Sequence, residues 1–135
     1  MPQRNVYGGP EIAAGESESD VLDVGTDVVV GLVVPNEWSS ASVSVLVSPD
    51  GISFLDLYDG KGNEVTFNAE PGAAISVDPD RFLMARCLKF RSGTRGAPVV
   101  QKQRCKFRVV GVAQASDAGG DGTGNDTLPV KAPRK

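Results

Sequence analysis

Short apolar segments separated by turn residues dominate this chain. Residues 28–34 form an unbroken, mostly β-branched run that a proline ends, which predicts a strand buried on both faces. In residues 42–48 apolar and polar positions alternate, so Val43, Val45 and Val47 are expected to face a core. No segment keeps a long amphipathic helical period. Strands, not helices, are therefore the elements that this pattern predicts.

Further segments have the same character. They are residues 12–14, 21–24, 54–58, 64–67, 73–77, 84–91 and 104–112. Turn sequences rich in Pro, Gly, Asn and Asp separate them, and residues 59–63 are expected to make a hairpin turn. We expect the last two segments to pair with each other as neighbouring strands. Many short strands with regular turn signals predict an all-β fold, an antiparallel β-sandwich of the jelly-roll type.

The length and composition predict one folded domain with an extended arm at each end. A chain of 135 residues is long enough to bury one hydrophobic core. We expect the β-sandwich to span residues 11–113 and residues 1–10 to form an N-terminal arm. Residues 114–135 have the composition of a Gly/Asp-rich linker followed by an extended basic tail.

Charge is divided unevenly along the chain. Residues 81–113 contain nine basic residues and no acidic one, whereas the first 80 residues contain fourteen acidic residues and two basic ones. This division favours electrostatic docking with a partner, including another copy of the chain; the alternative is that the two parts pair within one domain. Four cations on the last two predicted strands are expected to form one basic stripe: Lys89, Arg91, Lys106 and Arg108. The complete set expected to bind a partner is Lys89, Arg91, Arg95, Lys106, Arg108, Lys131, Arg134 and Lys135.

The basic stripe does not by itself predict binding to nucleic acid. Proteins that bind single strands place exposed aromatic side chains beside their cations, and the bases stack on them. Phe90 and Phe107 fall on the opposite strand face from the cations, so we expect them in the core. The net charge of −3 also opposes general affinity for phosphates. Nucleic acid is therefore not an expected partner.

The residue types needed for catalysis and for metal binding are sparse. Histidine, the commonest general base and metal ligand, is absent from the chain. Cys87 and Cys105 lack metal-site spacing and alternate onto opposite strand faces, so two free thiols are expected rather than a disulfide. Carboxylate pairs such as Asp56 and Asp59 suit solvated turns. We expect no catalytic residue, no metal site and no cofactor.

The sequence carries no feature that directs it to a membrane. No apolar run reaches membrane-spanning length, and the first residues lack the apolar stretch of a secretory signal. We therefore expect a protein made in the cytoplasm, without a membrane partner.

Two resemblances to known families follow from these segments. Residues 48–54 followed by residues 82–90 resemble the layout of discoidin-like, galactose-binding β-sandwiches. The fuller pattern resembles small structural proteins from the virions of tailed bacteriophages and prophages. The segments that carry this second resemblance are residues 12–20, 34–38, 57–65, 89–94 and 98–101.

The virion resemblance implies a non-enzymatic β-sandwich protein of the particle, namely a capsid decoration or cement protein. Such a protein would bind the major capsid protein, contact other copies of itself, and lie on the capsid surface of a virion assembled in the bacterial cytoplasm. The discoidin-like resemblance implies the alternative, a carbohydrate-binding module of a phage tail or fibre. Its candidate aromatic residues are Tyr7, Trp38 and Tyr58. An accessory role in the tail or connector is the remaining alternative.

Overall fold

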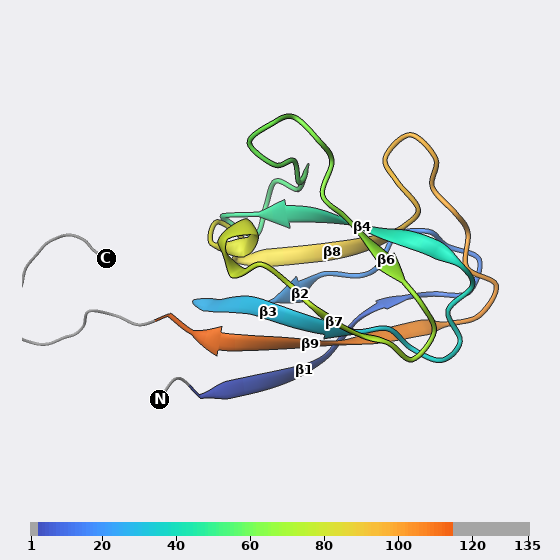
Figure 1. Cartoon of the computed structure of the whole chain (residues 1–135), viewed down its shortest axis with the longest axis horizontal. Helices are drawn as coiled ribbons and strands as arrows, with labels where there is room; N and C mark the ends of the chain where they lie inside the picture. Colours follow the sequence, from blue (N-terminus) through green and yellow to red (C-terminus); the bar gives the residue numbers. More distant parts are fainter. Residues whose placement is uncertain (1–2, 115–135) are drawn as a thin grey trace, which may run out of the picture.

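The chain folds into two antiparallel β-sheets that face each other, which confirms the predicted all-β sandwich (Figure 1). The computed structural model describes residues 3–114. Sheet A contains, in spatial order, β1 (Arg4–Ile12), β9 (Cys105–Ala113), β3 (Asp27–Val33) and β7 (Ala74–Ser76). Sheet B contains β2 (Leu22–Asp23), β8 (Cys87–Ser92), β4 (Ala41–Ser48) and β5 (Leu55–Asp56), and β6 (Thr66–Ala69) also pairs with β4. A short 3-10 helix, η1 (Pro79–Phe82), precedes β8.

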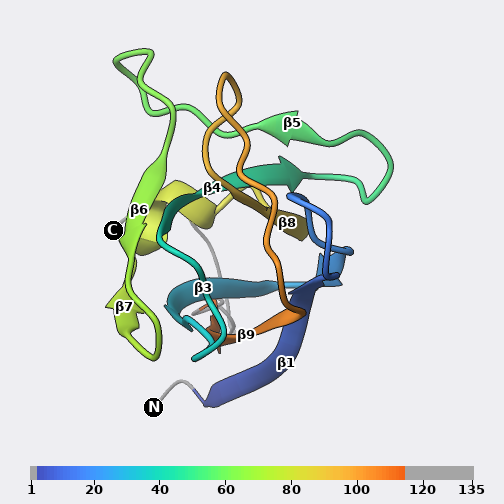
Figure 2. The same cartoon turned by 90° about the vertical axis from the view of Figure 1, so that its right-hand side faces the viewer.

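The chain crosses repeatedly between the two sheets, with β4, β5 and β6 following one another within sheet B. β1, β3, β7 and β9 belong to sheet A, whereas β2, β4, β5, β6 and β8 belong to sheet B. Figure 2 shows the two layers and the connections that cross between them. This strand order is compatible with a jelly roll, which stays a prediction. The predicted tail, with Lys131, Arg134 and Lys135, lies outside the described residues.

The core lies between the sheets and is built by the alternation seen in the sequence. Val43, Val45 and Val47 of β4 are at most 1% exposed, which confirms their predicted inward orientation. Phe90 of β8 and Phe107 of β9 are also fully buried, and their ring centroids lie 5.0 Å apart in an edge-to-face arrangement. Aromatic pairs of this geometry add about 1 kcal/mol beyond the area that they bury. Apolar side chains from both inner faces thus join the two sheets.

The β3 strand differs from the prediction of a strand buried on both faces. Its inner positions are buried, but Val30, Gly31 and Val33 are only half-buried. A register shift between Val29 and Gly31 marks a β-bulge opposite β9. The continuous apolar run therefore gives sheet A an outer face that is apolar but not covered.

The N-terminal residues do not form the predicted arm. β1 begins at Arg4 and pairs with β9, from Arg4 opposite Val112 to Gly8 opposite Arg108. Tyr7 faces inward and its hydroxyl donates to the Asp27 carboxylate at 2.5 Å. The pairing with β9 and the Tyr7 contacts hold this segment in the sheet. Its polar composition does not indicate a strand, which is why the sequence predicted an arm.

The predicted pairing of the last two long strands is also wrong. β8 lies between β2 and β4 in sheet B, whereas β9 lies between β1 and β3 in sheet A. Cys87 and Cys105 consequently belong to different sheets, and both thiols are free and buried. The basic stripe expected along two neighbouring strands therefore does not form.

Candidate functional site

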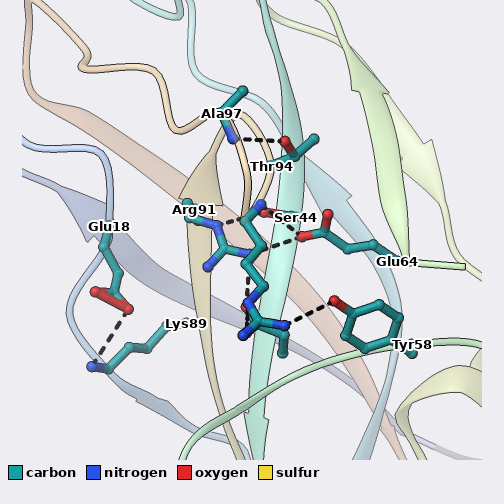
Figure 3. Close-up of polar contacts among 10 residues, drawn as sticks. Glu18, Ser44, Tyr58, Glu64, Lys89, Arg91, Thr94 and Ala97 are labelled. Carbon is teal, nitrogen blue, oxygen red and sulfur yellow. Dashed lines mark hydrogen bonds and ion pairs between the residues drawn. The ribbon is translucent and has the colours of Figure 1, made fainter.

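A cluster of charged residues lies on the outer face of sheet B. Arg91 of β8 extends between two carboxylates, with its Nη2 atom 2.8 Å from Asp56 Oδ1 and 2.8 Å from Glu64 Oε2. Figure 3 shows Arg91 beside Glu64 and Ser44. Its Nε donates to the Ser44 hydroxyl on the neighbouring strand β4 at 3.0 Å. The cluster thus joins the central strands of sheet B to the β5–β6 region.

This cluster is largely withdrawn from solvent. The side chains of Arg91, Asp56 and Glu64 are 11%, 20% and 17% exposed. Asp56 Oδ1 is close to Arg91 but receives no hydrogen bond of good angle, so the contact is an ion pair without a hydrogen bond. Charges held in this way are compensated by one another and are poorly available to a partner.

Arg95 closes the cluster on its solvent side. Its backbone N–H donates to Glu64 Oε2 at 3.0 Å, and its guanidinium donates to the Tyr58 hydroxyl at 3.3 Å. Its Nε also lies 3.4 Å from Asp56 Oδ2, although the side chain is 65% exposed. The hairpin turn predicted for residues 59–63 supports this arrangement, because Asp59 N–H donates to the Asn63 carbonyl and places Tyr58 opposite Glu64.

Lys89, two residues before Arg91 on β8, also contacts residues of the same domain. Its Nζ lies 3.9 Å from Glu18 and 4.9 Å from the centroid of the Phe54 ring (Figure 3 draws the pair with Glu18). All three basic residues expected on this part of the chain therefore contact acidic residues of the first 80. For sheet B, the acidic and basic parts pair within one domain.

Lys106 and Arg108 are placed differently, on the outer face of sheet A. Both project from β9 into solvent, and neither has an ion-pair partner among residues 3–114. They border a hollow of about 240 Å³ beside Asn36 and Gly72. These two cations are available to an external acidic group.

Apolar side chains continue the same face beyond the two cations. Val110 and Val112 follow Arg108 at alternate positions of β9, and Val6 of β1 lies directly opposite Val110. Directly opposite residues of antiparallel strands share a face. A shallow depression of about 340 Å³ extends it over β3 and β7, past Val33 and Ala74. We call this surface, with Lys106, Arg108, Val6, Val110, Val112 and Val33, the sheet A face.

The structure therefore divides the predicted partner-binding residues into two groups. Lys89, Arg91 and Arg95 belong to internal ion pairs on sheet B, and Lys106 and Arg108 belong to the sheet A face. The apolar part of that face was missed by the sequence prediction. The sequence predicts an arm at Val6. In residues 109–112 no polar residue marks the outward positions, so the inward and outward sides of the strand cannot be told apart from the pattern.

Within residues 3–114, the side chains suited to metal binding are not clustered, and the two thiols are buried. This part of the chain brings together no group of three or more Cys, Asp or Glu side chains that could hold a metal ion. Burial raises the pKa of both Cys87 and Cys105, which makes the thiolate forms less accessible. In the described part, no helix has the length and apolar character to cross a membrane.

Comparison with known proteins adds no relative. No protein-family model matches the chain, and no curated protein is significantly similar to it.

Proposed function

We propose that this protein is a non-enzymatic structural component of a tailed-bacteriophage virion, a decoration or cement protein that binds the major capsid shell. The observation that carries the proposal is the sheet A face, where the exposed Val6 and the half-buried Val110 and Val112 adjoin two cations that have no ion-pair partner among residues 3–114. A surface of this composition has the anatomy of a protein interface, with an apolar centre and a polar rim. We name the major capsid protein as the partner because the sequence resembles virion proteins.

Lys106 and Arg108 favour an acidic partner surface. Exposed cations at the rim of an interface accelerate association and orient the partners, while the apolar centre contributes most of the affinity. Val6, opposite Val110, is 64% exposed and so offers apolar surface to a partner. On the capsid, many copies would act together, so modest affinity per copy suffices.

The non-enzymatic part of the proposal is supported by the charged cluster on sheet B. Asp56 and Glu64 are two carboxylates that share one neighbour, Arg91, which bridges both of them. Carboxylates held in this way are engaged inside the domain, and their charges are compensated by the shared guanidinium. The chain also contains no histidine, the commonest general base.

Copy number in purified particles tests the proposal directly. Quantitative mass spectrometry should find this chain at the number of major capsid subunits or a simple fraction of it. A small copy number set by tail symmetry would favour the tail or connector role. Its absence from particles would overturn the virion proposal altogether.

Carbohydrate binding is the second candidate, and one aromatic residue favours it. Trp38 is 3% exposed and packs against Phe107, so it is not available to a sugar. Tyr58 is 43% exposed and borders a groove. Exposed aromatic rings beside polar groups are typical of sugar sites. A glycan array with no bound glycan would eliminate this candidate.

A further inference from the structure

A groove lies apart from the sheet A face, between η1 and the connection formed by residues 57–65. Its volume is about 330 Å³. The apolar residues that line it are Leu57, Tyr58, Val65, Leu83 and Met84. In Figure 1, η1 and the last residues of β9 lie at the same end of the sandwich.

Several large apolar side chains of this groove remain open to solvent. Tyr58, Leu83 and Met84 are 43%, 55% and 53% exposed. Neighbouring exposed apolar side chains of this size commonly mark a binding surface. Leu57 and Val65, which are buried, form the floor. The groove thus offers apolar contacts that the folded domain itself does not use.

The rim of the groove is acidic on balance. Asp59 and Asp80 border it together with one cation, Arg81. Hydrogen bonds from the backbone N–H groups of Asn63 and Lys61 hold the pKa of Asp59 below its usual range, so Asp59 is ionised at neutral pH. Asp80 is exposed and has no ion-pair partner within residues 3–114. A ligand that is apolar at one end and basic at the other would match these features.

We propose that this groove binds the chain's own C-terminal segment, residues 128–135. The segment opens with Leu128-Pro-Val130 and continues with three cations, Lys131, Arg134 and Lys135. Pro129 and Pro133 favour an extended backbone, which loses little conformational entropy on binding and packs well against an aromatic ring such as Tyr58. The apolar residues occupy the floor, and the cations lie towards Asp59 and Asp80.

The linker is long enough for this contact within one molecule. Fourteen residues, 114–127, separate the end of β9 from the segment. A Gly-rich random coil of this length has a root-mean-square span of roughly 20 Å. Tethering at that range gives an effective concentration in the millimolar range, so the groove of the same molecule is occupied before that of a second copy. The inference does not depend on the virion proposal.

Paramagnetic relaxation in the full chain tests the contact. A nitroxide is attached through a Thr127→Cys substitution; Cys87 and Cys105 are buried and so react slowly. The readout is the methyl signal of Met84, one of only two methionines in the chain. Docking predicts that the Met84 signal loses most of its intensity while the methyl signals of Val6, on the sheet A face, keep theirs. Equal broadening of both signals, or none, would overturn the proposal.

Two matched substitutions and one mixing experiment make the test specific. Asp80→Lys should weaken docking by about fivefold, since it replaces an attractive exposed pair with a repulsive one. The control Glu16→Lys changes the charge equally, on the exposed connection after β1, and should leave the Met84 broadening unchanged. The mixing experiment combines an isotope-labelled chain that carries no nitroxide with a chain that carries the nitroxide but no isotope label. Docking within one molecule predicts no broadening of the Met84 signal in this mixture. Broadening in the mixture would instead assign the groove to the tail of a second copy and refute docking within one molecule.

Discussion

Arg91 is the cation that two neighbouring carboxylates share. It is 11% exposed and lies 2.8 Å from both Asp56 and Glu64, so its removal would leave two carboxylates facing each other with little solvent. The cost of breaking such a pair comes mainly from the charge that remains uncompensated. Arg91 is therefore a structural residue, although its sequence context suggested a partner-binding one.

We expect Arg91→Met to lower the free energy of unfolding by about 2–4 kcal/mol, because both carboxylates lose the cation between them and Asp56 keeps only the exposed Arg95. Urea denaturation monitored by the fluorescence of Trp38 gives this difference. The control Lys106→Met removes an exposed cation without an ion pair among the described residues and should change stability by less than about 0.5 kcal/mol. Equal effects of the two substitutions would refute the structural role of Arg91.

Tyr7 gives the stability of the protein a distinct dependence on alkaline pH. Burial and, secondly, the hydrogen bond to Asp27 raise the pKa of Tyr7 from 10.0 to about 12. Because the folded pKa lies above the unfolded one, the contribution of Tyr7 is complete below pH 10 and is lost as the pH rises towards 12.

The comparison with Tyr7→Phe isolates this contribution from that of other groups that ionise in alkali. We expect the stability difference between the wild-type chain and Tyr7→Phe to shrink between pH 10 and 12. Urea midpoints measured across this range provide the test. A difference that stays constant with pH would show that Tyr7 ionises equally in the folded and unfolded chains.

Among the elements, the connection between β8 and β9 depends on a buried polar residue. Gln101 is completely buried, and its side-chain amide donates to the Ser39 carbonyl and to the Ser92 hydroxyl. Its carbonyl oxygen accepts from Ser39 N–H at 2.9 Å. Its backbone also pairs with the connection that follows β1, through Glu16 and Gly15. One glutamine thus holds three connecting segments at the same end of the sandwich.

We expect Gln101→Ala to destabilise the fold by about 2–4 kcal/mol, since it leaves buried donors and acceptors unpaired and opens a cavity. Gln103→Ala is the matched control, because the Gln103 side chain is exposed, and it should cost less than about 0.5 kcal/mol. Chemical denaturation of both variants is sufficient. A Gln101→Ala variant as stable as the control would mean that water replaces the lost hydrogen bonds.

The elements also show which parts of this fold local sequence can predict. The alternation around Val45 predicted β4 and its inward face correctly, because side-chain direction follows from strand geometry alone. The partners of β8 and β9 were predicted wrongly, because the choice of sheet depends on contacts between distant segments. Gln101 was missed for the same reason: its partner Ser39 lies 62 residues away.

At the scale of the whole molecule, the uneven charge of the sequence has two different outcomes. On sheet B the cations pair with acidic residues from the first half of the chain, as Arg91 and Lys89 do. On the sheet A face, Lys106 and Arg108 stay available. The basic residues on sheet B, and Arg104 beside Glu11 of β1, are thus used in internal ion pairs, and we assign partner binding to the two remaining cations of the sheet A face.

This assignment predicts that Lys106→Glu combined with Arg108→Glu weakens binding to the capsid shell without unfolding the domain. Both side chains are exposed, so their reversal affects encounter with an acidic partner more than folding. We expect at least about a tenfold loss in affinity for purified shells, since two rim pairs change from attraction to repulsion. Cosedimentation with shells that lack the protein gives the affinity.

The control for this prediction must change the charge equally on the other layer. Lys61→Glu combined with Arg86→Glu does so, because both residues are exposed and lie outside the sheet A face. The wild-type affinity should fall as salt rises, and the sheet A variant should show a weaker salt dependence than either the wild type or the control. Equal losses in both double variants would indicate a response to net charge alone. Full binding by the sheet A variant would show that Lys106 and Arg108 are only solvated, and the apolar strip around Val6 and Val110 would then have to account for attachment by itself.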